Sequence, residues 1–114
     1  MVSVPDFKAM ILDFPETEEA AHFDKCSYKV KKKIFATLNE KEGRITIRLS
    51  PMDQSIMCNI DKNIIYPVPN KWGHQGWTHV ILDKVSSEML HGFLVAAFCE
   101  VAPKKLADAF LDGD

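Results

Sequence analysis

The stretch KCSYKVKKKIFATLNEKEGRITIRL, residues 25–49, decides the fold, because apolar and polar side chains alternate along most of it. Alternation with a period of two is typical of strands that bury one face. We expect three strands, over residues 23–30, 34–38 and 44–49. Residues 31–33 are polar and residues 39–43 end on a glycine that can adopt a positive φ, so both segments suit chain reversals. The stretch therefore predicts an antiparallel meander.

The alternation also predicts which side chains share a face of the meander. One face is apolar and contains Cys26, Tyr28, Val30, Ile45, Ile47 and Leu49. The other face is basic and contains Lys25, Lys29, Arg44 and Arg48, with Lys31, Lys32 and Lys33 at one tip of the meander. This assignment depends on the register, because a shift of one residue would exchange the two faces.

Helix signals flank the meander on both sides. Ser3 and Ser50 are each followed within three residues by a proline and an acidic residue, which is the usual order at a helix start. We expect the first helix to end before Pro15, with residues 16–19 as its exit loop. The second helix is expected to have an apolar side formed by Met52, Ile56, Met57 and Ile60.

Shorter strands and further helices follow in the second half of the chain. Residues 63–67 and 77–82 are expected to be extended. Ser86 precedes the clearest helix, whose apolar residues recur at spacings of three and four as far as Phe98. A last short helix is expected over residues 103–110. The resulting order, α-βββ-α-ββ-α-α, predicts an α+β fold in which helices back one face of an antiparallel sheet.

Length and composition fit a single globular domain over residues 1–114. Of these residues 46% are hydrophobic and 26% are charged, which is ordinary for globular proteins. The N-terminus lacks the pattern of a signal peptide, and no segment approaches the roughly 18 apolar residues of a membrane span. We therefore expect a cytoplasmic protein with no membrane partner. The three cysteines form no Cys-x-x-Cys pair, so we expect free thiols.

Four segments form a series along the chain. They are Phe14-Pro-Glu with His22-Phe23, Lys33-Ile-Phe-Ala-Thr-Leu38, Tyr66-Pro-Val-Pro with Trp72-Gly-His-Gln-Gly-Trp-Thr, and Val101-Ala-Pro-Lys-Lys-Leu106. In their order and spacing they resemble the MmcQ/YjbR family. The resemblance covers nearly the whole chain and implies a CyaY-like α+β fold, also described as a double-wing arrangement. Members of the family are commonly labelled DNA-binding proteins, and the family brings no set of catalytic residues.

The basic face is the first candidate site. The chain has a net charge of −2, yet residues 25–48 contain eight lysines and arginines and two glutamates, a local net charge of +6. Such donors, when spread over a surface, bind phosphates and make the affinity fall with salt. We expect DNA phosphates to be bound by Lys25, Lys29, Lys31, Lys33, Arg44 and Arg48. The alternative, which is the commoner situation, is a solvated sheet face whose charges prevent aggregation.

A second candidate site lies in the segment VPNKWGHQGWTHV, residues 68–80, which holds both tryptophans. Its prolines and glycines predict a tight loop that leads into a strand at Trp77, and we expect Trp77 to be mainly core. Lys71, Trp72 and His74 are then expected at the exposed tip of the loop. The alternative function is therefore a non-enzymatic protein- or small-ligand-binding module that uses Lys71, Trp72, His74 and Trp77.

Catalytic and metal sites are not expected. His74 and His79 are five residues apart without a cysteine or carboxylate beside them, which is too little for a tetrahedral metal site. Neither Cys26 nor Cys58 belongs to a nucleophile motif, and the sequence has no glycine-rich loop of the phosphate-binding type. We expect no enzymatic activity, no metal and no other cofactor.

Overall fold

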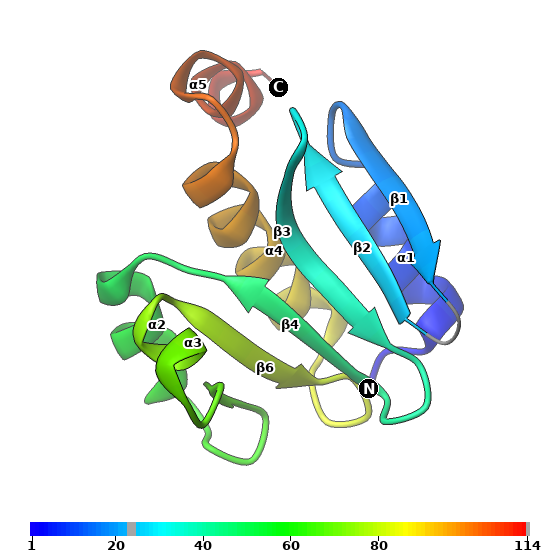
Figure 1. Cartoon of the computed structure of the whole chain (residues 1–114), viewed down its shortest axis with the longest axis vertical. Helices are drawn as coiled ribbons and strands as arrows, with labels where there is room; N and C mark the ends of the chain where they lie inside the picture. The colour runs from blue at the N-terminus through cyan, green and yellow to red at the C-terminus, as the bar shows by residue number, and fades with distance from the viewer. Residues whose placement is uncertain (23–24, 114) are drawn as a thin grey trace.

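The computed structural model describes residues 1–22 and 25–113 and consists of an antiparallel sheet with helices packed against it (Figure 1). The elements are α1 (Val4–Leu12), β1 (Thr17–His22), β2 (Lys25–Val30), β3 (Lys33–Asn39), β4 (Arg44–Arg48), α2 (Pro51–Cys58), β5 (Ile65–Pro67), α3 (Lys71–His74), β6 (Trp77–Ile81), α4 (Ser87–Val101) and α5 (Lys104–Asp112). The strand order across the six-stranded sheet is β1-β2-β3-β4-β6-β5. The expected α+β class is confirmed.

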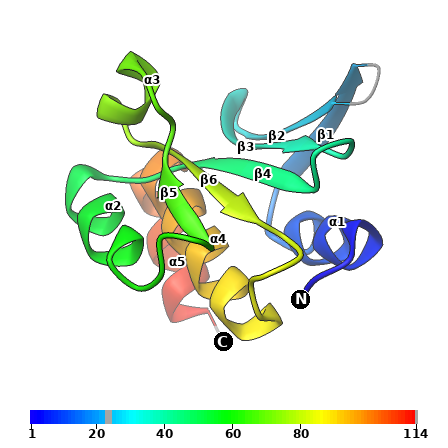
Figure 2. The same cartoon turned by 90° about the horizontal axis from the view of Figure 1, so that it is seen from below.

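Helices cover one face of the sheet and leave much of the other uncovered. Figure 2 shows α1, α4 and α5 on one side of the sheet, whereas α3 stands on the opposite side. The uncovered side, here called the open face, carries one cross-strand row formed by Ser27, Thr37, Thr46 and His79. Their neighbours two positions away in β2, β4 and β6 share this face, and so does Asn39 in β3. Within the described ranges, no helix combines the length and hydrophobicity needed to span a bilayer.

The core fills the space between the sheet and the helices that cover it. α4 contributes Leu90, Leu94 and Phe98, and α1 contributes Phe7 and Ile11, all of which are buried. The ring of Phe14, two residues after α1, packs on three phenylalanine rings, with centroid distances of 6.4, 5.4 and 5.3 Å to Phe35, Phe98 and Phe110. These aromatic contacts join α4 and α5 to the sheet.

Three helix starts predicted from serine are present. The hydroxyls of Ser3, Ser50 and Ser86 each accept a hydrogen bond, at 3.1 Å, from the backbone N–H three residues later. Each bond satisfies an N–H that the first helical turn leaves without a partner, which stabilises the helix by about 1 kcal/mol. The sequence therefore located the beginnings of α1, α2 and α4 correctly.

The acidic segment after α1 was expected to be a loop, and this expectation is wrong. Residues Thr17–His22 form β1, which pairs with β2 along its length. Glu18 lies directly opposite Lys29, and such opposite charges stabilise a strand pair. On the covered side, the Tyr28 hydroxyl donates a hydrogen bond of 2.7 Å to the Glu19 carboxylate. The acidic residues Glu18 and Glu19, which suggested a loop, instead interact with residues of β2.

The expected apolar side of α2 is also largely wrong. Met52, Ile56 and Ile60 are 72%, 59% and 56% exposed, and no residue of this helix is fully buried. Met57 packs against the core from the side. The physical reason is the position of the helix, because α2 lies beside β5, at the edge of the sheet. At that position the helix exposes to solvent the side chains that it would bury if it lay on the covered face of the sheet.

The remaining elements agree closely with the sequence. The observed order is α-ββββ-α-β-α-β-α-α, which differs from the expected order by the added β1 and by α3, a single turn where a loop was expected. The strand expected over 23–30 begins at Lys25 in the structure, and residues 23 and 24 lie outside the described residues. The other strands and helices start or end within two residues of their expected bounds.

Candidate nucleic-acid interface

The open face carries the four basic residues predicted for it. Cross-strand partners lie on the same face of a sheet, and Asn39 pairs with both Lys25 and Arg44. Lys29 follows Lys25 at a spacing of four along β2, and Arg48 does the same after Arg44 in β4. Lys25 and Arg48 are exposed, and Lys29 and Arg44 are half-buried. The predicted facing of the meander therefore agrees with the structure.

A β-bulge in β3 changes which side chain stands beside Lys29. The register shifts between Tyr28, which pairs with Ala36, and Lys29, which pairs with Ile34. Phe35 is the extra residue and is fully buried together with Ala36. Ile34 is thereby returned to the open face with 36% of its surface exposed. The bulge places an isoleucine on the open face and keeps the phenylalanine in the core.

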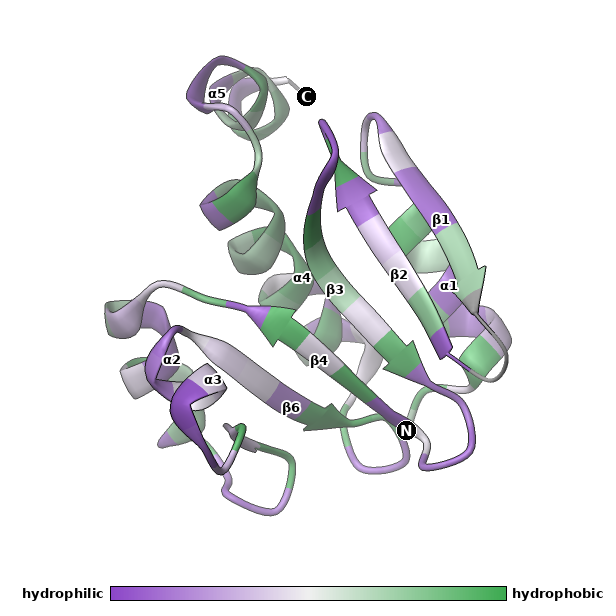
Figure 3. Ribbon diagram, in the orientation of Figure 1, coloured by the Kyte–Doolittle hydropathy of each residue, from purple (hydrophilic) through white to green (hydrophobic). Residues whose placement is uncertain are grey.

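The turn between β2 and β3 is formed by Lys31 and Lys32, whose backbones lie in the left-handed region of φ/ψ space. Lys31 and Lys32 have φ values of +51° and +71°, as in the type I′ turns that favour Asn-Gly. The Lys31 amine forms an ion pair with Glu16, so this lysine is partly neutralised. In Figure 3 the tip and the two ends of β4 have the purple colour of hydrophilic residues.

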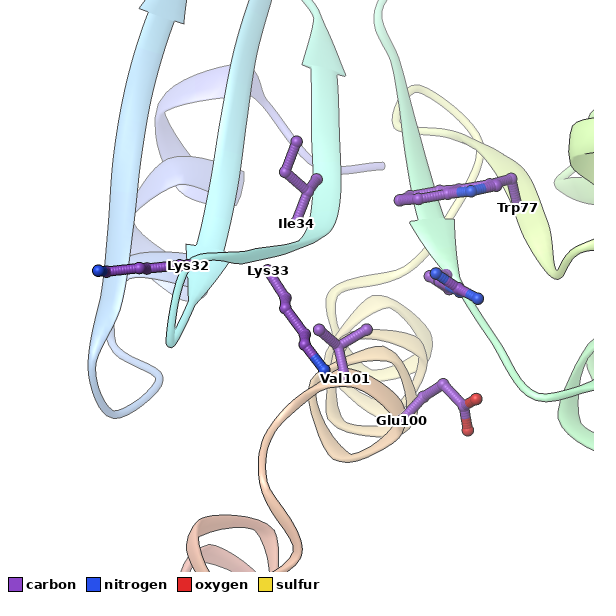
Figure 4. A pocket seen from close by; sticks show the side chains of 7 residues that line it. Lys32, Lys33, Ile34, Trp77, Glu100 and Val101 are labelled. Atoms are coloured by element: carbon purple, nitrogen blue, oxygen red, sulfur yellow. The ribbon is translucent and has the colours of Figure 1, made fainter.

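Two neighbouring hollows share Ile34 and Trp77 on the open face. The basic hollow, about 460 Å³, is lined by these two residues and by Lys32, Lys33, Arg48, Glu100 and Val101. The aromatic hollow, about 280 Å³, is lined by the same two residues and by Thr37, Thr46, Val68, Trp72 and His79. Figure 4 shows the indole of Trp77 directed toward Ile34, and the Lys33 amine directed toward Val101 and Glu100. A cationic surface and an aromatic surface therefore adjoin.

Trp77 was expected to be mainly core, and the structure corrects this. In β6 the inward side chains are Thr78 and Val80, so Trp77 and His79 lie on the open face and are half-buried. Trp77 pairs across the sheet with Arg48, whose guanidinium carbon lies 5.8 Å from the centroid of the ring. The register of β6, rather than the size of the side chain, decides the exposure of this tryptophan.

The three residues expected at the loop tip are exposed but do not line one common hollow. Lys71, Trp72 and His74 belong to α3, whose first turn is capped by Asn70, the side chain of which accepts a 2.8 Å hydrogen bond from the Trp72 N–H. Trp72 is 50% exposed and lines the aromatic hollow. His74 lines a different depression, beside α2, and so is separated from Trp77.

Two glycines hold α3 close to the strands that precede it. A Cβ on Gly73 would lie 2.0 Å from the carbonyl oxygen of Val68, and one on Gly76 would lie 2.1 Å from that of Leu49. The Gln54 amide donates hydrogen bonds to the Gly73 carbonyl oxygen at 2.9 Å and to Thr78 Oγ1 at 3.0 Å. These contacts fix the height at which Trp72 stands above the sheet.

His79 contributes a polar group to the aromatic hollow. Its Nδ1 lies 2.9 Å from Thr46 Oγ1, and its ring makes an edge-to-face contact with Tyr66 at 5.4 Å. Burial lowers the pKa of His79, and the nearby charge of Arg44 lowers it further, which favours the neutral ring. Sequence reasoning missed Thr46, His79 and Ile34 as site residues. The alternation of Trp77 and His79 in β6 was the signal that could have identified His79.

Comparisons with known proteins agree with this architecture. The family model described as YjbR matches residues 12–100, which is more than half of the chain. The chain belongs to the YjbR family. This YjbR chain is also similar to the crystal structure of the Deinococcus radiodurans protein DR2400, which has a domain of the family DUF419. The TM-score is 0.76 at 22% sequence identity, over 98% of this chain and 87% of that one, and the likeness concerns the fold. No curated protein matches the chain.

Proposed function

We propose that this YjbR protein binds DNA through the basic residues of its open face. The observation that carries the proposal is the register that brings Lys25, Lys29, Arg44 and Arg48 to one accessible surface. Lys32 and Lys33 extend this surface at the basic hollow. Cations spread in this way meet several phosphates of one backbone, and each contact releases counterions.

Two carboxylates temper the positive charge of the same surface. Glu18 stands opposite Lys29, and Glu100 lines the basic hollow. Glu18 is therefore expected to reduce the contribution of Lys29, and Glu100 that of the cations in the basic hollow. We also propose that the protein binds without catalysis. In support, burial raises the pKa of the Cys58 and Cys99 thiols, which disfavours the nucleophilic thiolate form.

The test is a fluorescence-polarisation titration of labelled DNA at salt concentrations between about 50 and 200 mM. Four neutralised phosphates predict that log K falls against log salt with a slope of about −3.6 on duplex DNA. The variant Lys29→Ala/Arg44→Ala/Arg48→Ala should bind more weakly and show a much shallower slope. If the wild-type protein does not bind DNA at low salt, the proposal is wrong.

A matched control removes the same charge elsewhere. Lys62, Lys84 and Lys105 are exposed and lie in the loops after α2 and β6 and in α5. Their triple alanine variant has the same net charge as the open-face variant. It should keep most of the affinity if the location of the charge matters, and an equal loss in both variants would indicate a general charge effect.

A further inference from the structure

We propose that the aromatic hollow receives one unpaired base of single-stranded DNA while a phosphate of the same strand lies in the basic hollow. This inference rests on the proposed function and deepens it, since it names the form of DNA that the open face selects. The two hollows share the side chains of Ile34 and Trp77, so a base and its phosphate can occupy them together.

The size and lining of the aromatic hollow suit a planar ring. Its volume of about 280 Å³ is below the range of about 300 to 1,000 Å³ typical of sites for drug-sized ligands. Trp72 from α3 and Trp77 from β6 supply aromatic surface on which bases stack. Thr37, Thr46 and His79 add hydroxyl and imidazole groups, which hydrogen bond to the edges of bases.

The charge beside the hollow selects this occupant over an apolar peptide segment. Lys32, Lys33 and Arg48 line the adjoining basic hollow with the single carboxylate of Glu100. An apolar peptide would fill the aromatic hollow and offer no anion to these cations. A nucleotide chain provides an anion next to every base, so it complements both hollows at once.

The same geometry disfavours duplex DNA. A paired base is stacked within the helix, and its extrusion costs a few kcal/mol before it can reach a protein pocket. An unpaired base is free to turn toward Trp72 and Trp77. The open face should therefore bind the phosphates of both forms, and the aromatic hollow should add affinity for the single strand alone.

The experiment compares three probes in fluorescence polarisation. They are an oligo-dT of roughly 15 nucleotides, the upper range of single-strand sites, an abasic oligomer with the same number of phosphates, and a duplex of the same length. The wild-type protein should bind oligo-dT about tenfold more tightly than the abasic oligomer, as expected from stacking of one base. Trp72→Ala should bring this ratio close to one and leave the affinity for the abasic oligomer unchanged.

Two further variants separate stacking from folding. Trp72→Phe keeps an aromatic face and should retain most of the ratio, and its remaining tryptophan, Trp77, should be quenched by oligo-dT but not by the abasic oligomer. Met52→Ala removes a side chain of α2 that is 72% exposed and lies outside both hollows, and it should behave as wild type. Far-UV circular dichroism of each variant checks that the fold is retained.

The possible results distinguish the inference from the proposed function. Salt-sensitive binding with equal affinity for oligo-dT and the abasic oligomer would keep the proposed function and overturn the base site. The base site is likewise overturned if the duplex binds as tightly as oligo-dT, or if Trp72→Ala leaves the ratio intact. If none of the three probes binds at low salt, both proposals fail.

Discussion

Arg48 of β4 and Trp77 of β6 are direct cross-strand partners, with the guanidinium carbon 5.8 Å from the centroid of the ring. At this distance a guanidinium is attracted by the negative face of an indole. The pair also forms part of the boundary between the basic hollow and the aromatic hollow, because Trp77 lines both and Arg48 lines the first. One contact therefore orients both parts of the proposed interface.

The energetic role of this contact can be measured by removing the cation. Arg48→Ala should lower the free energy of unfolding by about 0.5 to 1 kcal/mol, the usual size of an exposed cation–π contact. In a Trp72→Phe background the emission of Trp77 should shift as well. Arg44→Ala is the control, since it removes the same charge from the same strand, and Arg44 pairs with Ile81 rather than an aromatic residue. Equal losses in the two variants would exclude a specific contribution from the ring.

The turn at Lys31 and Lys32 should be a site where stability can be gained. Their φ values of +51° and +71° are unfavourable for lysine and suit Asn-Gly. Lys31→Asn/Lys32→Gly should therefore raise the free energy of unfolding by about 1 kcal/mol after the loss of the weak ion pair with Glu16. Urea unfolding measures the change. The variant Lys31→Ala/Lys32→Ala loses the same two charges and should show no gain.

Gly76 should tolerate no side chain, because its φ is +103° and a Cβ would lie 2.1 Å from the carbonyl oxygen of Leu49. Gly76→Ala is expected to lower the free energy of unfolding by at least about 2 kcal/mol. Gly92→Ala is the matched control, since Gly92 is within α4 and has nothing within 4 Å of its added Cβ. That change should raise stability by about 0.5 to 1 kcal/mol, as Gly→Ala does in helices. Thermal unfolding of both variants tests whether Gly76→Ala lowers stability and Gly92→Ala raises it.

Tyr28 should make stability depend on pH under alkaline conditions. Its pKa is raised above the ordinary value of 10.0, first by burial and then by the hydrogen bond to the Glu19 carboxylate. Above about pH 10 the unfolded chain therefore loses this proton while the folded chain keeps it, so the free energy of unfolding falls as pH rises. Tyr28→Phe should reduce this slope by up to about 1.4 kcal/mol per pH unit. Urea titrations at pH 8 and above pH 10 compare this variant with the wild-type protein.

Local patterns in the sequence were sufficient for much of the fold. The three serine caps act within one helical turn, and the alternation in β2 and β4 reports burial directly, so neither requires a distant contact. β1 could not be found in this way, because its stability depends on pairing with β2. The exposed side of α2 was missed for a related reason, since its place at the sheet edge is set by residues far away in the sequence.

In the candidate interface, too, some features follow from local sequence patterns and others from distant contacts. The sequence by itself determined that basic side chains of β2 and β4 share a face, because a period of two leaves one choice of facing once the apolar residues are buried. The tertiary structure alone decided that Trp72, Trp77 and Ile34 meet beside them. That meeting requires the bulge at Phe35, the register of β6, and the close approach of Gly73 and Gly76 to the backbone. Each of these depends on contacts between strands and loops that are far apart in the chain, and a local pattern does not encode them.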